Sequence, residues 1–570
     1  MLPAVDVTPD NSGPPPPPAP PAPPRLFRRA LVGGVVFVLV AGLVFGGISA
    51  FRFFRGAGDR LASLVPDDAA VYVTAYLDPA GSQKLAALGL LGKFPNLGSQ
   101  AQVDSAINQA LDTALAPAGL GHNDVRPWVG GQLAVMVSAT APATAGAGVG
   151  TPLFAYLIAS NDDSKAQSAL IKYESSSAGK AMTWVTHTHA GVTVNVGQGE
   201  ATGETHAWAI VDGTVVGSNG EALVDELIDT AHGNHATLTS TADFTTLNGR
   251  LPADRLALAY VDVPRLARLV TTGLARSSAP LGDLSAYHGA GMTLSATSDG
   301  VEINGVADVD AGKLSGASRN ALAIAPHVNS TLAFVPLHAY GMYALTGLPQ
   351  LIRSLLDQFA HGSSGQNAAP ALSFITPLLA HMTGDAGFEV GAVAGRVIPA
   401  GALFVGVDSD ASGRQLTSTL ELFGCGSTGA CDPQKTTSQV YRGTTITTLR
   451  ISSDLTNLGV APSWAVSDGM AIIASSPDEV RAVLDARAGG NVTGSLGYRT
   501  AIGHADSSNN GVLYLDVGSI AAAVRAALPG DARQQYDQQV APYLNPFKTF
   551  VLTSRSASDR VTLRAFFEIR

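Results

Sequence analysis

AWAIVDGTVVGS, at residues 207–218, and SWAVSDGMAIIAS, at residues 463–475, share one pattern and decide the fold of this chain. In each stretch, two short apolar runs flank an Asp-Gly dipeptide, which is a strong signal for a tight β-hairpin. Each is followed by residues with helical apolar spacing, Glu221 to Asp229 and Asp478 to Asp485. The chain is therefore expected to contain the same hairpin and helix twice.

Other segments around these hairpins recur in the same order. Each is an apolar strand pattern or the turn that opens one. Three matched pairs of strand patterns are 153–158 with 403–407, 258–263 with 513–517, and 298–303 with 558–563. In the fourth pair, Val65-Pro66 precedes an expected strand at 70–77, and Ala325-Pro326 precedes an expected strand at 331–335. A collinear series of this kind indicates an internal duplication. We predict two homologous units, at 63–312 and 320–570.

Within each unit, short strands alternate irregularly with helices. Apolar residues at helical spacing predict a helix over 103–115 in the first unit and one over 348–359 in the second. The strands often come as hairpins, which favours antiparallel pairing over a doubly wound sheet, and no G-x-G-x-x-G motif follows the first strand. We predict an α+β fold: two homologous extracytoplasmic units of mainly antiparallel sheet with packed helices, preceded by one transmembrane helix.

An uncharged run of 22 residues, Ala30 to Phe51, lies between Arg29 and Arg52. As a helix, this run is long enough to span a hydrocarbon core of about 30 Å. The alternative is a cleaved signal peptide, because Ile48-Ser49-Ala50 resembles a small-residue cleavage site. The run exceeds the usual apolar core of a signal peptide and basic residues follow it at once, so we favour a retained single-pass anchor at 30–51.

The segments around the anchor complete the domain organisation. Residues 1–29 form a Pro-rich tail that builds neither helix nor sheet, and residues 52–62 form a juxtamembrane linker. Arginines are balanced on the two sides of the anchor, so the positive-inside rule does not decide its orientation. The Lys-poor C-terminal part and its cysteine pair favour a cytoplasmic N-terminus and an extracytoplasmic C-terminal region at the cell membrane. The spacing of Gly42 and Gly46 leaves a homodimer through the anchor open.

The charge of the chain limits its partners. The 570 residues carry a formal net charge of −10, and only 14% of them are charged. A nucleic-acid-binding surface needs a basic face, so we expect no nucleic-acid partner. The partners that remain are the membrane, through residues 30–51, and an envelope protein, a glycan or a lipid.

Cys425 and Cys431 are the two cysteines of the chain. One pair does not supply the four ligands of a structural zinc site, and five intervening residues do not match the C-x-x-C redox motif. In an oxidising compartment we expect a disulfide that closes a small Gly-rich loop. We assign this pair a stabilising role.

The stretch from Leu64 to Pro95, LVPDDAAVYVTAYLDPAGSQKLAALGLLGKFP, resembles the opening of the DUF3352 family. The Pro-rich tail, single apolar segment and long C-terminal region resemble that family too. The resemblance implies a bacterial, mainly actinobacterial, membrane-anchored protein of unknown function, and it supplies no catalytic residues. Within the stretch, Asp78 is the expected cap of a following helix, and Lys84 is expected in a salt bridge.

His187 and His189 are the candidate metal ligands. They alternate on an expected strand over 185–194, so both side chains point to one face. Further imidazoles that would complete a ligand set are those of His206, His232 and His235. The matching strand of the second unit has no histidine, and an exposed strand rich in Thr and His also explains the pattern. We therefore assign no metal and no cofactor from the sequence alone.

Ser177 and Lys180 have the S-x-x-K spacing of penicillin-recognising acylases. Residues 507–509 resemble the S-D-N motif of those enzymes, but no K-T-G follows, since the nearest match is Lys548-Thr549-Phe550. Ser177 also lies in an expected loop, so we assign no catalytic residue.

Paired acidic residues recur at equivalent places in the two units, as Asp162 and Asp163 in the first and Asp408 and Asp410 in the second. Such pairs suggest calcium ligands. Both pairs directly precede an expected amphipathic helix, where Asp is a common cap, so we predict helix capping.

These observations favour a membrane-anchored envelope protein with a non-catalytic binding or scaffold ectodomain. Two alternatives stay open. One is an extracytoplasmic binder of lipids or other hydrophobic ligands, and the other is an envelope hydrolase with an unfamiliar site.

Overall fold

The structure is a computed structural model that describes residues 59–139, 152–199, 203–273, 284–361, 377–391, 399–424, 436–450 and 459–570. The expected anchor at 30–51, the Pro-rich tail at 1–29 and the pair Cys425 and Cys431 lie outside these ranges. No helix within these ranges is both long and apolar enough to cross a membrane.

Twenty strands make up the described sheet. Those of the first half are β1 (Ala69–Tyr76), β2 (Val129–Ser138), β3 (Phe154–Ser160), β4 (Thr183–His189), β5 (Val192–Gln198), β6 (Thr205–Val211), β7 (Thr214–Ser218), β8 (Ala257–Asp262), β9 (Tyr287–Ala296) and β10 (Gly300–Val309). Those of the second half are β11 (Ala339–Leu345), β12 (Met382–Gly391), β13 (Ala400–Val407), β14 (Thr436–Tyr441), β15 (Thr444–Leu449), β16 (Ser463–Ser467), β17 (Met470–Ala474), β18 (Gly511–Asp516), β19 (Phe547–Ala557) and β20 (Arg560–Ile569).

The two halves pair their strands in the same order. The first runs β4-β5-β6-β7-β3-β2-β1-β8-β9-β10. The second runs β14-β15-β16-β17-β13-β12-β11-β18-β19-β20. All of these pairings between described strands are antiparallel, which confirms the predicted α+β class with mainly antiparallel sheet.

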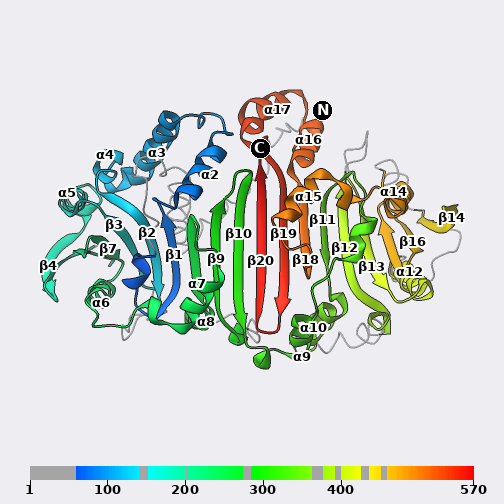
Figure 1. Ribbon diagram of the computed structural model, residues 1–570, viewed down its shortest axis with the longest axis horizontal. Helices are drawn as coiled ribbons and strands as arrows, with labels where there is room; N and C mark the ends of the chain where they lie inside the picture. The colour runs from blue at the N-terminus through cyan, green and yellow to red at the C-terminus, as the bar shows by residue number, and fades with distance from the viewer. Residues whose placement is uncertain are drawn as a thin grey trace, which may run out of the picture.

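Strands β10 and β20 join the two halves into one sheet. They pair antiparallel from Gly300 opposite Glu568 to Asp308 opposite Arg560. Asn304, the fifth residue of β10, lies opposite Arg564, the fifth residue of β20. The joint therefore has a local twofold arrangement, with β10 and β20 side by side at the centre and β4 and β14 at opposite ends (Figure 1).

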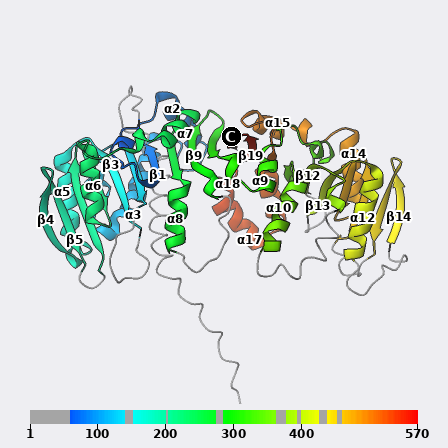
Figure 2. The ribbon, with the colours of Figure 1, turned by 90° about the horizontal axis from the view of Figure 1, so that it is seen from below.

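Helices cover both faces of this sheet. In the first half they are α2 (Gly81–Leu91), α3 (Gln100–Leu115), α4 (His122–Val125), α5 (Asp163–Glu174), α6 (Glu221–Ala231), α7 (Ala242–Arg250) and α8 (Val263–Gly273). The later ones are α9 (Gly316–Leu322), α10 (Leu348–His361), α12 (Asp410–Gly424), α14 (Pro477–Ala488), α15 (Leu496–Gly503), α16 (Val517–Ala527), α17 (Gly530–Gln535) and α18 (Ala541–Leu544). Near the centre, α2 and α15 lie on one side of the sheet and α8, α10 and α17 on the other (Figure 2). The helices predicted over 103–115 and 348–359 are confirmed as α3 and α10.

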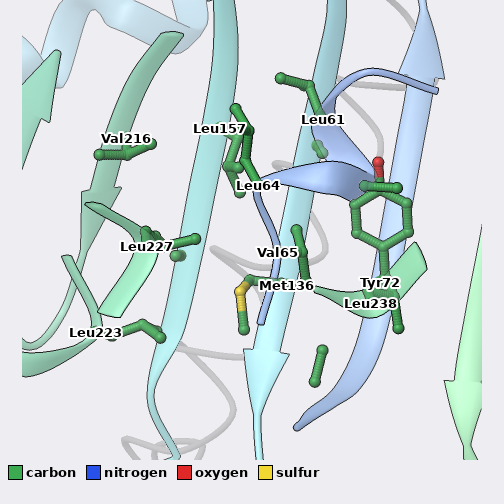
Figure 3. Close-up of a cluster of buried hydrophobic side chains, with 14 of the residues drawn as sticks. Leu61, Leu64, Val65, Tyr72, Met136, Leu157, Val216, Leu223, Leu227 and Leu238 are labelled. Atoms are coloured by element: carbon green, nitrogen blue, oxygen red, sulfur yellow. The ribbon is translucent and has the colours of Figure 1, made fainter. Parts of the chain in front are cut away.

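Each half buries its own core between the sheet and a helix that follows a hairpin. In the first half, Leu223 and Leu227 of α6 pack against Leu157 of β3 and Met136 of β2 (Figure 3). In the second half, α14 packs in the same way against β13, β16 and β17. The opposite face is covered by α5 in the first half and by α12 in the second. Alternate residues of a strand face opposite layers. Since helices cover both layers, both faces of these strands are apolar.

The two hairpins predicted at the Asp-Gly dipeptides are confirmed. Asp212 and Gly213 have φ of 49° and 67°, and Asp468 and Gly469 have φ of 52° and 70°. Positive φ at both central residues is the conformation that a two-residue hairpin needs, and Asp and Gly tolerate it. These turns join β6 to β7 and β16 to β17.

The start of the first unit lies earlier than predicted. Leu61 and Ala62, which we placed in the linker 52–62, are fully buried in the first core. They belong to a short 3₁₀ helix, η2 (Leu61–Ser63), whose backbone is held by the side chains of Asp59 and Gln132. The described fold therefore begins at Asp59.

The strand expected at 331–335 is wrong. Residues 330–334 form a 3₁₀ helix, η8 (Ser330–Phe334), because the Asn329 carboxamide accepts a hydrogen bond from the Thr331 amide at 3.0 Å and turns the chain. The strand is β11, further along. The match to Val65-Pro66 is accordingly Val335-Pro336, since the carbonyl oxygens of Val65 and Val335 accept equivalent hydrogen bonds from Leu238 and Val492.

We predict that Gly300→Val weakens the joint between the halves. A Cβ at this position would overlap the carbonyl oxygen of Phe567 and the ring of Phe566. Such overpacking costs about 1–3 kcal/mol, which chemical unfolding of the full chain would measure as a lower free energy of unfolding. The matched control is Arg560→Val at the equivalent position of β20, which already carries a Cβ. An equal loss in both variants would contradict the steric explanation.

Candidate functional site

A group of metal-ligating side chains lies where the edge strand β4 meets helix α6. His187 and His189 alternate along β4, as predicted, and both face the helix. The single strand expected over 185–194 is wrong, because Ala190 and Gly191 turn the chain between β4 and β5. Glu221, Asp225 and Asp229 follow each other at intervals of four residues on α6, so they form one stripe along it. The other stripe of α6 carries the leucines of the first core, which fixes the rotation of the helix and turns the acidic stripe toward β4.

The side chains of this group approach each other closely. The Nε2 of His187 lies 3.5 Å from a carboxylate oxygen of Glu221 and 3.5 Å from Oδ1 of Asp225. The Nδ1 of His189 lies 3.8 Å from the same Oδ1 of Asp225, and its Nε2 lies 3.0 Å from Oδ2 of Asp229. Within the described ranges, His187, Glu221 and Asp225 are the set of three whose ligand atoms all lie within 4.8 Å of one another.

Two atoms at the centre of this group make no hydrogen bond. Oδ1 of Asp225 and Nε2 of His189 are buried as atoms, yet neither has a hydrogen-bond partner. The side chains themselves are half-buried, since 24% of Asp225 and 30% of His189 are exposed. A group of this kind is able to hold a cation that reaches it from solvent. We name it the His–acid cluster: His187, His189, Glu221, Asp225 and Asp229.

The other histidines proposed from the sequence do not join the cluster. His206 lies between two tyrosines, with Nε2 3.1 Å from the Tyr156 hydroxyl and Nδ1 3.1 Å from the Tyr173 hydroxyl. Burial lowers the pKa of His206 to about 4, so the imidazole is neutral and has a structural role. His235 lies beside Glu226 at 3.5 Å, and His232 is exposed at the end of α6.

The S-x-x-K pattern does not form a catalytic group in this fold. Ser177 lies in the loop after α5, and Lys180 is exposed in a short 3₁₀ helix that follows it. Asn509, the expected amide partner, belongs to the second half and donates to the carbonyl oxygen of Asp506 at 2.8 Å. The motif residues are therefore divided between the two halves.

Asp162 of the first acidic pair caps a helix as predicted, but the capping prediction for Asp408 and Asp410 is wrong. Asp162 caps α5 by accepting a hydrogen bond from the Lys165 amide, and the hydrogen bonds it accepts from Ser164 and Lys165 lower its pKa to about 2. In the second half the capping side chain is Ser409, whereas Asp408 contacts His381 at 2.9 Å and Asp410 accepts a hydrogen bond from the amide of Gly469.

Asp78 does not cap a helix. Helix α2 begins after Ala80, which offers no capping side chain, and Asp78 lies in a bend two residues before that cap position. The carboxylate of Asp78 lies instead 3.4 Å from Nζ of Lys84, which confirms the predicted salt bridge of Lys84.

A pocket of about 420 Å³ lies between the halves. Its lining is contributed by the connection around α9 and by the turn between β19 and β20. Arg319 is the charged residue in this lining, and its guanidinium donates to the carbonyl oxygens of Ala311, Gly312 and Leu314. These bonds use the Nε and Nη2 donors of the guanidinium to hold the connection around α9.

The second half buries two carboxyl groups that the sequence analysis missed. Glu389 of β12 is 1% exposed, and Glu479 of α14 is 3% exposed. Both oxygens of Glu389 lack a hydrogen-bond partner, while Nε2 of His338 lies 3.2 Å from each oxygen of Glu479. Burial, and then the neighbouring charge of Glu479, raises the pKa of Glu389 to about 9.

This carboxyl pair replaces an apolar pair of the first half. Glu389 lies opposite Met342, as Met136 lies opposite Tyr72, and Glu479 is the third residue of α14, as Leu223 is the third residue of α6. Met136 and Leu223 are both fully buried. A comparison of the two matched series of sequence segments could have found the pair, because a charged residue in one half corresponds to an apolar residue in the other.

We predict that Glu389 makes the fold sensitive to high pH. The folded state keeps the Glu389 proton up to about pH 9, whereas the unfolded chain loses it near the ordinary value of 4.5. The folded state therefore binds more protons in this window, and the free energy of unfolding falls as pH rises through it. Glu389→Met should remove this contribution and raise the free energy of unfolding at pH 8 by about 1–4 kcal/mol.

Urea unfolding at pH 5, 7 and 9 measures this effect. The matched control is Met136→Glu, which puts a carboxyl group at the equivalent apolar position and should lower the stability of the first half most at high pH. An unchanged pH dependence in Glu389→Met would contradict the inference that the raised pKa of Glu389 lowers stability at high pH.

Comparisons with known proteins place the chain in a family. A model described as "Protein of unknown function (DUF3352)" matches residues 31–386. No curated protein matches. Among solved structures, crystal form IV of TP0453 is 12% identical with a TM-score of 0.23, covering 44% of this chain and 81% of that one. Crystal form I of TP0453 is 10% identical with a TM-score of 0.23, covering 45% and 80%. At such TM-scores these similarities support no conclusion. The family match spans more than half of the sequence, and the chain therefore belongs to the DUF3352 family of proteins of unknown function.

Proposed function

We propose that this chain is a single-pass membrane protein of the cell envelope whose duplicated ectodomain binds a ligand outside the cytoplasm and catalyses no reaction. The observation that carries this proposal is the chemical difference between the two ends of the sheet. The halves pair ten strands in the same order, yet β4 carries a His–acid cluster, whereas β14 carries Gln439 and Tyr441 beside basic residues. Conserved architecture with different polar surfaces fits a scaffold that presents binding groups.

The duplication itself is part of this proposal. The ordered sequence segments, the equivalent Asp-Gly turns and the shared strand order are the features that support it. The twofold arrangement of β10 against β20 is what two copies of one unit produce when they associate through the same edge.

The position of the first unit relative to the membrane follows from the proposed anchor. Seven residues, 52–58, separate the apolar run from Asp59. An extended chain advances at most about 3.6 Å per residue, so the linker reaches about 25 Å. Asp59 accepts a hydrogen bond from the Tyr72 hydroxyl at 2.7 Å, and the Arg60 guanidinium donates to the carbonyl oxygen of Asp212 at 2.6 Å. The anchor would thus hold the first unit close to the membrane surface.

We predict that Leu39→Arg combined with Val40→Arg releases the chain from membranes. Each Arg at the centre of a spanning helix costs about 2.5–3.5 kcal/mol of insertion free energy. The wild-type chain should stay in the membrane pellet after alkaline carbonate extraction, and the variant should move to the supernatant. Val5→Arg in the Pro-rich tail is the control and should stay in the pellet. Release of the wild-type chain would contradict the proposed anchor.

Orientation and the absence of catalysis need separate measurements. An alkaline phosphatase fused after Arg570 should be active in intact cells, because that enzyme folds only outside the cytoplasm. An inactive phosphatase would reverse the proposed orientation. Hydrolysis of an envelope substrate by the purified full chain, abolished by one side-chain substitution, would contradict a non-catalytic ectodomain.

A further inference from the structure

The His–acid cluster has the donor atoms and spacing of a metal site. We propose that the His–acid cluster binds one divalent transition-metal ion of the zinc class, held by His187, Glu221 and Asp225, with His189 and Asp229 beside these ligands. The inference stands on the geometry of β4 and α6 and does not depend on the proposed membrane anchor or on the orientation of the chain.

The spacing of the donor atoms suits a tetrahedral ion. Zinc lies about 2.0–2.2 Å from nitrogen and oxygen ligands, so neighbouring ligand atoms in a tetrahedron are about 3.4 Å apart. The Nε2 of His187 lies 3.5 Å from an oxygen of Glu221 and 3.5 Å from Oδ1 of Asp225. These distances are too long for good hydrogen bonds, but they leave room for an ion between the three groups.

The hydrogen bonding of the cluster is incomplete without an ion. Oδ1 of Asp225 lies within 3.8 Å of both imidazoles but accepts no hydrogen bond, and Nε2 of His189 makes none although Asp229 is 3.0 Å away. Buried polar atoms are usually satisfied, so an unsatisfied carboxylate oxygen in this cluster indicates a missing partner. A cation bound at Oδ1 of Asp225 would satisfy that atom and offset part of the charge of the carboxylates.

The second half supplies an internal comparison. β14 ends at Tyr441 before the turn Arg442-Gly443, as β4 ends at His189 before Ala190-Gly191, and all four turn residues have positive φ. Gln439 and Tyr441 therefore stand where the first half has His187 and His189. On the helix, Arg481 and Asp485 are the fifth and ninth residues of α14, as Asp225 and Asp229 are of α6.

At these equivalent positions the second half forms direct hydrogen bonds instead of a donor cluster. The guanidinium of Arg481 donates to the carboxamide of Gln439 at 2.8 Å. The Tyr441 hydroxyl donates to the Asp485 carboxylate at 2.9 Å, and Arg442 donates to the same carboxylate at 2.6 Å. In the second half, arginine and tyrosine side chains thus pair with the polar side chains of the helix. In the first half, imidazoles take these places, and a metal ion would bridge them to the carboxylates.

The donor set also selects the class of metal. Two imidazoles with carboxylates favour zinc and its transition-metal neighbours, whereas calcium and magnesium prefer oxygen ligands alone. The strand β4 is the edge of the sheet, and 36% of the His187 side chain is exposed, so an ion reaches the cluster without opening the fold.

Isothermal titration of the untagged full chain in detergent micelles tests the proposal. Zinc chloride should bind with one equivalent, and His187→Ala with His189→Ala should weaken this binding by at least about tenfold. Gln439→Ala with Tyr441→Phe, at the equivalent positions of the second half, should leave it unchanged. Calcium chloride should show no binding that depends on His187 or His189.

Melting temperatures show whether a loss of zinc binding in the variant comes from a folding defect. Zinc should raise the melting temperature of the wild-type chain but not that of the double variant, and with EDTA both should melt alike. If the alanine variant does not fold, His187→Gln with His189→Gln takes its place. Absence of one-equivalent zinc binding, or binding that survives loss of both histidines, would overturn the proposal.

Discussion

The pairing of β10 with β20 is the constraint on which the whole molecule depends. Each ten-strand arrangement alone would end in an unpaired edge at this place, with backbone groups open to another strand. Joining the two edges leaves β4 and β14 as the ends of one sheet. The joint also completes a small core, since Ile569 of β20 packs with Leu90 of α2 and Val301 of β10. The helix α2 is thereby tied to the last strand of the chain.

The two halves share some structural features and differ in others. Features of the backbone occur in both halves: the Asp-Gly turns, the hydrogen bonds to the carbonyl oxygens of Val65 and Val335, and the order of strands. Polar side chains differ at equivalent positions. The apolar pair Met136 and Leu223 corresponds to two buried carboxyl groups, and the His–acid cluster corresponds to a set of direct hydrogen bonds. The two halves therefore share a backbone architecture and differ in their polar side chains. The second half differs in its core, through the buried carboxyl groups, and the first half differs at its outer edge, through the His–acid cluster.

Local signals in the sequence predicted local structure well. Periodicity placed α3 and α10, and the Asp-Gly dipeptides placed two hairpins, because these elements depend on neighbouring residues. The 3₁₀ helix at Ser330–Phe334 was missed because one hydrogen bond, donated by the Thr331 amide to the Asn329 side chain, turns a stretch that has strand composition. The β10–β20 joint has no local signal, since its partners are about 260 residues apart. His187 and His189 were identified from the sequence, but their acidic partners on α6 were not. The four-residue spacing of Glu221 and Asp225 does indicate that both lie on one face of the predicted helix.

The twofold arrangement at Asn304 and Arg564 has a genetic consequence. In a symmetric dimer of separate chains, one substitution appears at both sides of the interface, so a costly residue is introduced twice. Here the two sides are encoded separately, and β10 carries Asn304 where β20 carries Arg564. A single chain can therefore accept a charged or strained residue in one half while the other half retains a stable apolar version. Because both sides of the joint lie in one chain, a substitution changes one side and leaves the other as it was.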